Sequence, residues 1–299
     1  MKGYREVAFA KVNLCLFLGG PRADGRHRLV TVFESVGLID HLVITPVSSG
    51  PDEVICPGVS GANLVTDALS GLRAAGWSAP PVRVEIEKRI PVAAGLGGGS
   101  ADAAAMLRYA PALSPMPIAA LETIAARLGA DVPSQLDPGP SLGTGAGEVV
   151  VPVDALEAHG LLVLPQSFGL STADVYREAD RLGLARTARE LAALRADLET
   201  IVMAGGHSAQ RLPERLIVND LQPAALSLAP PIGAALELAR QGGAAQALVC
   251  GSGPTVIGVF WGPDGVHRAQ LAAKALRRRF PAATAVDVVL RAVVAATAG

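Results

Sequence analysis

The stretch PVAAGLGGGSADAAAML, residues 91–107, decides the fold and the chemistry of this chain. It follows the alternating segment VRVEIEKRI at 82–90, holds four glycines within residues 95–99, and continues into an alanine-rich segment. The alternation predicts a strand over 82–90, and the alanines predict a helix from about Ser100 to Tyr109. The glycine-rich run is therefore expected to connect a strand to the start of a helix.

A loop of this kind is suited to binding the phosphates of ATP. Glycines permit positive φ and carry no side chain that would hold a triphosphate away, while a helix N-terminus offers unpaired N–H groups and a partial positive charge. The loop is neither a P-loop, because no Lys-Ser/Thr pair follows, nor GxGxxG, because Gly95, Gly97 and Ser100 miss the last glycine. The alternative is a plain turn with Ser100 as the helix N-cap. We favour the phosphate loop, because four glycines make a costly connection if only a turn is required.

The composition limits the remaining choices. The 299 residues suffice for two domains, and half of them are hydrophobic. The 26 basic and 27 acidic residues give a net charge of −1, and no basic block exceeds Arg277–Arg279, so nucleic acid is not an expected partner. A small-molecule substrate remains open, and the sequence does not indicate an oligomeric state.

The chain is expected to be a cytoplasmic protein without a membrane segment. Cys15, Cys56 and Cys250 are odd in number, far apart and outside any zinc-like pattern, which favours a reducing compartment. The N-terminus lacks the apolar stretch of a signal peptide, and the apolar segments 248–262 and 285–299 are interrupted by Gly and Pro or by charges.

The pattern along the chain predicts an α+β protein with two units, at 1–159 and 160–299. In the first unit we expect strands at 7–18 and 82–90, a helix ending at Gly129, and a glycine-rich loop with a short strand at 141–151. In the second unit we expect strands at 160–165, 247–250, 256–261 and 284–290, with helices near 172–182, 187–203, 213–221, 231–241 and 266–279.

Lys11 and Asp131 are the candidate catalytic pair. Lys11 lies in the middle of the apolar strand at 7–18, where an ammonium is expensive to bury unless an anion compensates it. Asp131 follows a helix stop in LGADVP. If the two meet, the cation keeps the carboxylate ionised, and the carboxylate orients or deprotonates an attacking hydroxyl. The alternatives are a snorkelling lysine and a helix-capping aspartate.

Three segments together resemble the three motifs of the GHMP kinases: AFAKVNLCLFL at 8–18, the glycine-rich run at 91–107, and LVCGSGPTVIGVF at 248–260. Further segments are similar to the branch of that superfamily whose acceptor carries a cytidine diphosphate group. They are RADGRHRL, TVFESVGLID, LGADVP, GTGAGE, STADVY and IVNDL. The resemblance covers nearly the whole chain, and the order and spacing of the segments make it specific.

The resemblance implies a two-domain GHMP kinase fold, with a ribosomal protein S5 domain 2-like N-terminal part, a ferredoxin-like C-terminal part and the site between them. It implies that Lys11 and Asp131 are catalytic, that Asn63 and Lys88 lie near the adenine, and that Mg²⁺ accompanies ATP, with Ser100 as a possible ligand. The implied ATP loop consists of Pro91, Val92, Ala93, Ala94, Gly95, Leu96, Gly97, Gly98, Gly99, Ser100 and Ala101.

For the acceptor, the resemblance implies that Asn13 lies beside Lys11, that His27 hydrogen-bonds cytosine, and that Tyr176 stacks on it with Thr172 nearby. By themselves, His27 reads as a turn residue and Tyr176 as a core residue of a helix. The glycines at 251–254 are expected beside the phosphate loop, and the alternative is a turn between two strands.

The chain departs from the family pattern at two places. Arg26 stands where tyrosine is usual before the histidine, and a guanidinium can stack on a base in its place. Ser134 and Gln135 stand where bulky apolar residues are usual, so the wall behind Asp131 is expected to be more polar. Kinases of the homoserine or mevalonate type, and a non-catalytic nucleotide sensor, remain the alternatives.

Overall fold

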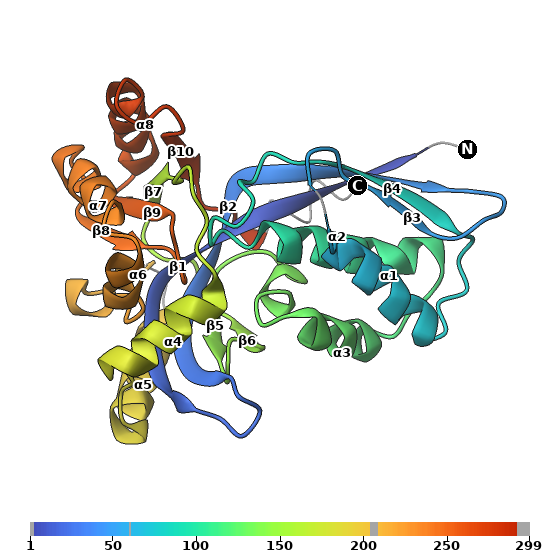
Figure 1. Cartoon of the computed structure of the whole chain (residues 1–299), viewed down its shortest axis with the longest axis horizontal. Coiled ribbons are helices and arrows are strands. Elements are labelled where there is room, and N and C mark those ends of the chain that lie inside the picture. Colours follow the sequence, from blue (N-terminus) through green and yellow to red (C-terminus); the bar gives the residue numbers. More distant parts are fainter. Residues whose placement is uncertain (1–2, 60, 204–208, 292–299) are drawn as a thin grey trace.

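The computed structural model describes residues 3–59, 61–203 and 209–291, which form two sheets with helices packed against them (Figure 1). In the larger sheet the strand order is β3-β4-β2-β5-β6, with β1 pairing against β2. The order of the smaller sheet is β10-β7-β9-β8. The strands of the larger sheet are β1 (Tyr4–Pro21), β2 (His27–Pro46), β3 (Glu53–Ile55), β4 (Val82–Glu87), β5 (Ser141–Thr144) and β6 (Val149–Pro152).

The β1–β2 hairpin is the longest feature of the fold, and it reaches both sheets (Figure 1). The two strands pair antiparallel from Tyr4 opposite Ile44 to Pro21 opposite His27. Their register shifts between Asn13 and Cys15, and such a bulge re-aims the side chains beside it. β1 also forms bridges to residues 186 and 219, so it contacts segments of the second unit as well as its own sheet.

Helices α1 (Leu64–Ala74), α2 (Gly98–Leu113) and α3 (Ile118–Leu128) pack in the N-terminal half, with α2 against both β1 and α1. The buried face of α2 is built mainly from alanines, which let the helix approach the strand closely. A short 3₁₀ turn, η1 (Pro133–Gln135), follows α3 and carries the chain back to the sheet. Asp131 lies just before this turn.

The smaller sheet consists of β7 (His159–Leu164), β8 (Gln246–Val249), β9 (Val256–Trp261) and β10 (Thr284–Asp287). Helices α7 (Ile232–Gln241) and α8 (Gly265–Leu276) pack against its strands. Between β7 and β8 the chain forms α4 (Thr172–Leu182), α5 (Ala188–Val202), η2 (Glu214–Leu216) and α6 (Gln222–Leu228). The larger sheet and the smaller sheet meet where the imidazole of His159 on β7 bonds the carboxylate of Glu34 on β2, 2.9 Å apart.

The predicted α+β class is confirmed, and most predicted elements exist. The helix at 172–182 is found with those bounds, but the helix predicted at 213–221 is wrong. That segment contains only η2, because the residues after it bond the backbone of β1 through Leu16, and the helix begins at Gln222. Strand β2 and helix α1 were not predicted from the sequence. The domain boundary at 159/160 stays a prediction. Residues 292–299, the end of the second predicted domain, lie outside those that the structure describes. No helix among the described residues is long and apolar enough to cross a membrane.

Candidate active site

A cavity of about 980 Å³ opens between the glycine-rich loop, β1, the start of β2 and the helix α4. Every site residue predicted from the sequence lines this cavity except Ala101, which is buried in the first turn of α2. The structure therefore brings together residues from positions 11 to 176 in one place. Their roles stay predictions.

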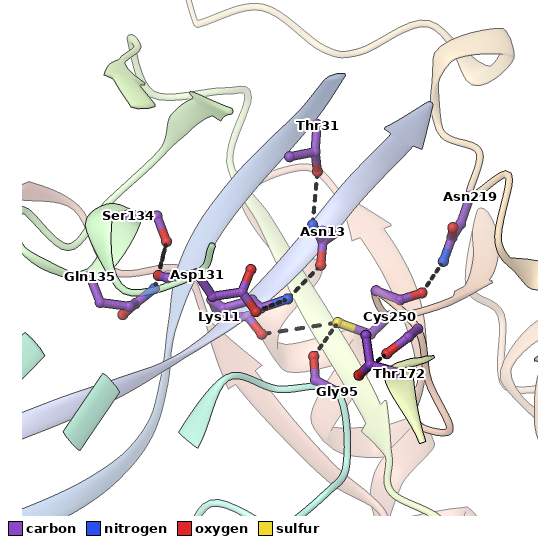
Figure 2. A network of polar contacts seen from close by, with 12 residues as sticks. Lys11, Asn13, Thr31, Gly95, Asp131, Ser134, Gln135, Thr172, Asn219 and Cys250 are labelled. Carbon is purple, nitrogen blue, oxygen red and sulfur yellow. Dashed lines mark hydrogen bonds and ion pairs between the residues drawn. The ribbon is translucent and has the colours of Figure 1, made fainter. Parts of the chain in front are cut away.

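Lys11 lines the cavity, and its ammonium has the carboxylate of Asp131 on one side and the amide of Asn13 on the other (Figure 2). Its Nζ is 3.2 Å from Oδ2 of Asp131 and donates to Oδ1 of Asn13 at 2.8 Å. The amide of Asn13 in turn donates to the hydroxyl of Thr31. The Lys11 side chain is buried, whereas that of Asp131 is 35% exposed. The carboxylate thus has a cationic partner on one side and remains open to the cavity on the other.

The glycine-rich loop runs directly beside Lys11. Gly97, at φ 69°, is the N-cap residue of α2, and a Cβ there would lie 2.8 Å from Cγ of Lys11. A larger side chain would displace the lysine. No side chain caps the helix N-terminus, so its first N–H groups remain available to an anion. The alternative in which Ser100 is the N-cap is wrong, because the helix begins at Gly98.

The loop at 250–254 packs against the glycine-rich loop. A Cβ on Gly95, at φ 80°, would meet the carbonyl oxygens of Gly253 and Cys250 at 2.7 and 2.8 Å. Asn219 holds the loop from the other side by donating to the carbonyls of Val249 and Gly251. Close backbone approach therefore requires glycine here, as expected. Asn219 belongs to the segment IVNDL, but no role was predicted for it from the sequence, where it lies between Val218 and Asp220.

Asn63 and Lys88 line the far end of the cavity, and both already have partners. Asn63 caps α1 by accepting from the N–H of Val65 at 2.9 Å. The ammonium of Lys88 donates to Asp40 and, at 2.7 Å, to Asp102. Burial alone would lower the pKa of Lys88, but the two carboxylates outweigh burial and raise it. Burial also raises the pKa of Asp102 to about 7, against the opposing effect of Lys88.

Asp40 and Asp102, which bind the Lys88 ammonium, were not predicted from the sequence. Asp102 is an acid within an alanine-rich helix, and such a residue needs a buried cation. Lys88 lies after a strand and 14 positions before Asp102, so the pair could have been suspected. Oδ1 of Asp102 has no hydrogen-bond partner within the described part of the chain.

His27 and Tyr176 face each other at the opposite end of the cavity. Their ring centroids are 5.1 Å apart at an interplanar angle of 35°. Nε2 of His27 is 2.7 Å from Oδ1 of Asp180, a residue of α4 that the sequence analysis did not single out. Thr172, at the start of α4, contacts the hydroxyl of Ser252 at 3.0 Å. Burial, and secondarily the charge of Asp131, raise the pKa of Tyr176 above its usual value.

Comparison with known proteins shows which family this chain belongs to. The model of the GHMP kinases N terminal domain matches residues 63–142, and that of the GHMP kinases C terminal domain matches residues 203–281. A 4-diphosphocytidyl-2-C-methyl-D-erythritol kinase from Nocardioides sp. is 39% identical over 277 residues, which cover 88% of this chain and 90% of the relative. One from Streptomyces coelicolor is 41% identical over 256 residues, covering 82% and 84%.

The chain belongs to the 4-diphosphocytidyl-2-C-methyl-D-erythritol kinase family of GHMP kinases. A crystal structure of 4-(cytidine 5'-diphospho)-2C-methyl-D-erythritol kinase superposes with a TM-score of 0.74 at 35% identity, covering 95% of this chain and 99% of that chain. Homoserine kinase from Cytophaga hutchinsonii superposes with a TM-score of 0.70 at 16% identity, covering 97% and 95%. The second likeness shows the fold alone.

The two departures from the 4-diphosphocytidyl-2-C-methyl-D-erythritol kinase pattern have clear structural settings. Arg26 is exposed at the hairpin tip, where its guanidinium pairs with Asp24 at 3.0 Å and lies 3.7 Å from Glu148. Ser134 and Gln135 are buried behind Asp131, and the hydroxyl of Ser134 donates to the carbonyl of Asp131 at 2.8 Å. This polar wall holds the backbone that carries the carboxylate.

A metal ion finds no ready cluster of protein ligands here. Across residues 3–59, 61–203 and 209–291, no three His, Cys, Asp or Glu side chains converge in a way that could hold one. Ser100 lies in the first turn of α2 and lines the cavity, and its role as a metal ligand stays a prediction.

Proposed function

We propose that this protein transfers the γ-phosphoryl group of ATP to the 2-hydroxyl of 4-diphosphocytidyl-2-C-methyl-D-erythritol, giving the 2-phosphate and ADP. The reaction belongs to non-mevalonate (methylerythritol phosphate) isoprenoid precursor biosynthesis, and we place the enzyme in the cytoplasm. The observation that carries the proposal is the Lys11–Asp131 pair, whose carboxylate opens into the cavity beside the uncapped N-terminus of α2.

ATP occupies the glycine-rich loop in this proposal. The N–H groups of residues 97–100 and the α2 N-terminus bind the phosphates, and Lys11 stabilises the negative charge of the transferring group. Ser100 would be the candidate protein ligand of a Mg²⁺ ion that accompanies ATP, and such an ion would neutralise phosphate charge. The adenine extends toward Asn63 and Lys88.

The acceptor lies across Lys11 from the nucleotide. Its cytosine stacks on Tyr176 within hydrogen-bonding reach of His27, while its erythritol end reaches Asn13 and Asp131. The attacking hydroxyl oxygen forms a bond to the γ-phosphorus as the bond to the bridging oxygen of ADP breaks, and Asp131 takes the hydroxyl proton. Because the transition state is loose, orientation and charge stabilisation by Asp131 and Lys11 contribute more than proton removal.

The competing functions have less support. Homoserine and mevalonate carry no base that would use the facing rings of His27 and Tyr176. A non-catalytic nucleotide sensor has no use for a buried lysine that holds a half-exposed carboxylate beside the phosphate loop.

The direct test is ADP release by the purified protein with Mg-ATP and each of three acceptors: 4-diphosphocytidyl-2-C-methyl-D-erythritol, homoserine and mevalonate. Turnover with the cytidine substrate alone is the expected result. Turnover with another acceptor would keep the kinase and discard the substrate. ATP binding without turnover of any acceptor would favour the sensor.

A further inference from the structure

Asp180 is placed to act on the acceptor site through His27. The two residues are 153 positions apart, and their side chains meet where α4 packs beside the first residue of β2, with Nε2 and Oδ1 at 2.7 Å. The His27 side chain is 8% exposed and that of Asp180 is 50% exposed. The arginines beside Asp180 on α4 are taken by other acids, Arg177 by Asp174 and Arg181 by Glu178. Asp180 therefore pairs with the imidazole of His27.

This contact decides which ring nitrogen of His27 carries hydrogen. A carboxylate only accepts hydrogen bonds, so Nε2 must be the donor in the His27–Asp180 contact. In the neutral ring the hydrogen on Nε2 leaves Nδ1 with its lone pair, as an acceptor. Among the described residues no hydrogen-bond partner occupies Nδ1, and His27 lines the cavity beside Tyr176. The site therefore presents a hydrogen-bond acceptor to whatever base stacks there.

Cytosine and uracil differ in the substituent at C4, which is the group that an Nδ1 acceptor would contact. Cytosine has an amino group at C4, which donates, and uracil has a carbonyl oxygen there, which only accepts. An Nδ1 lone pair bonds the amino group and repels the carbonyl oxygen. A site built around one hydrogen bond rejects the analogue that cannot make it, because its own polar atom is left unpaired.

We infer that Asp180 is a positioning residue that fixes His27 as a hydrogen-bond acceptor and thereby makes the acceptor site select cytosine over uracil. This inference rests on the proposed function, since it requires a cytidine-linked acceptor at this end of the cavity. It goes further in naming the residue that sets base choice, which lies outside the segments that identify the family. A merely structural Asp180, which only ties α4 to the hairpin, would lower binding of both bases equally.

The test compares turnover of the cytidine substrate with that of its uridine counterpart, at saturating Mg-ATP, for the wild type, Asp180→Asn and Asp174→Asn. Asparagine at 180 can donate to Nε2, so it lets the ring take either tautomer. Asp174 is the matched control, because it lies on the same helix and pairs with Arg177 but does not contact His27. In the wild type we expect a clear preference for cytidine, expressed as the ratio of kcat/KM values.

Asp180→Asn is expected to reduce that ratio about tenfold, mainly through a higher KM for the cytidine substrate, with the KM for ATP unchanged. Asp174→Asn is expected to leave the ratio as in the wild type. In a His27→Ala background, Asp180→Asn should change the ratio no further, because the residue through which it acts is gone.

An unchanged ratio in Asp180→Asn, or an equal loss for both bases, would overturn the inference while leaving the proposed function intact. A further change of the ratio in the His27→Ala background would show that Asp180 acts by another route and would also overturn it. Absence of cytidine turnover by the wild type would refute the proposed function and this inference together.

Discussion

Two lysines line the same cavity, and their partners differ. Lys11 meets one carboxylate, Asp131, which is 35% exposed, whereas Lys88 meets Asp40 and Asp102, whose side chains are 0% and 4% exposed. A partly exposed carboxylate can still form a hydrogen bond with a ligand. Two buried carboxylates instead hold the Lys88 ammonium in place as part of the protein structure. A charged residue in a cavity wall is therefore poised for chemistry only when its counter-ion remains open to the cavity. Breaking each pair in turn tests this difference.

The largest effect is expected at Asp131. Asp131→Ala should lower kcat by about 10²–10⁴-fold and leave ATP binding nearly unchanged, because in the proposed mechanism the carboxylate orients the attacking hydroxyl and takes its proton. Steady-state kinetics and nucleotide titration measure the two quantities. Asp137→Ala is the control, since Asp137 pairs with Arg291. Wild-type turnover in Asp131→Ala would remove Asp131 from the reaction.

The second effect concerns stability. Lys88→Met should lower the free energy of unfolding by about 3–5 kcal/mol, because Asp40 and Asp102 are left buried without their cation. Lys11→Met should lower it by much less, since Asp131 can turn to solvent, while it abolishes turnover. Urea unfolding compares them with Lys274→Met on the exposed face of α8, expected within about 0.5 kcal/mol of wild type. Equal losses at Lys11 and Lys88 would contradict the distinction.

A smaller effect is expected at the acceptor end, away from both lysines. Tyr176→Ala should raise the KM for the cytidine substrate about tenfold, since a stacked aromatic contributes about 1 kcal/mol beyond its buried area. The KM for ATP should stay the same, which initial-rate measurements with each substrate varied will show. An unaffected acceptor KM would remove Tyr176 from the site.

The smallest effect is a pH dependence of stability from Asp102. Burial raises the pKa of Asp102 in the folded protein to about 7, above its unfolded value of 3.8. The folded state therefore holds a proton that the unfolded state has lost, so this contribution is full below pH 3.8 and is lost as the pH rises through 7. Between pH 6 and 8 the wild type should lose about 1 kcal/mol relative to Asp102→Asn. Urea unfolding at the two pH values measures the difference in stability between the wild type and Asp102→Asn. An equal difference at both pH values would contradict this prediction.

The sequence predicted the elements that local pattern determines. The strand at 7–18 alternates, the glycine-rich run lies between a strand and an alanine-rich helix, and α4 is preceded by a capping serine, Ser171, and followed by Gly183. The cost of burying Lys11 predicted an anionic partner, and the resemblance pointed to Asp131. Apart from the choice of Asp131, which rests on the resemblance, these predictions need only nearby residues or the free-energy cost of burying a charge.

The features that the sequence did not reveal depend on long-range pairing. β2 contains Glu34, Gly37 and Asp40, which do not read as a strand until their partners are known. Glu34 is compensated by His159, 125 positions away, and Asp40 by Lys88, 48 positions away. Asp180 looks like an ordinary surface acid of α4 until the fold brings His27 beside it. Such roles follow from tertiary contacts and have no local signature.

The tip of the β1–β2 hairpin, residues 22–26, offers a separate route to new substrates. The strand ladder closes at Pro21 opposite His27, so the tip projects beyond the paired strands and reaches the acceptor end of the cavity through Arg26. Lys11 lies well inside the same hairpin, fixed by the backbone of the glycine-rich loop. Directed evolution toward other nucleotide-linked alcohols can therefore randomise this short segment while the phosphoryl-transfer centre keeps its geometry.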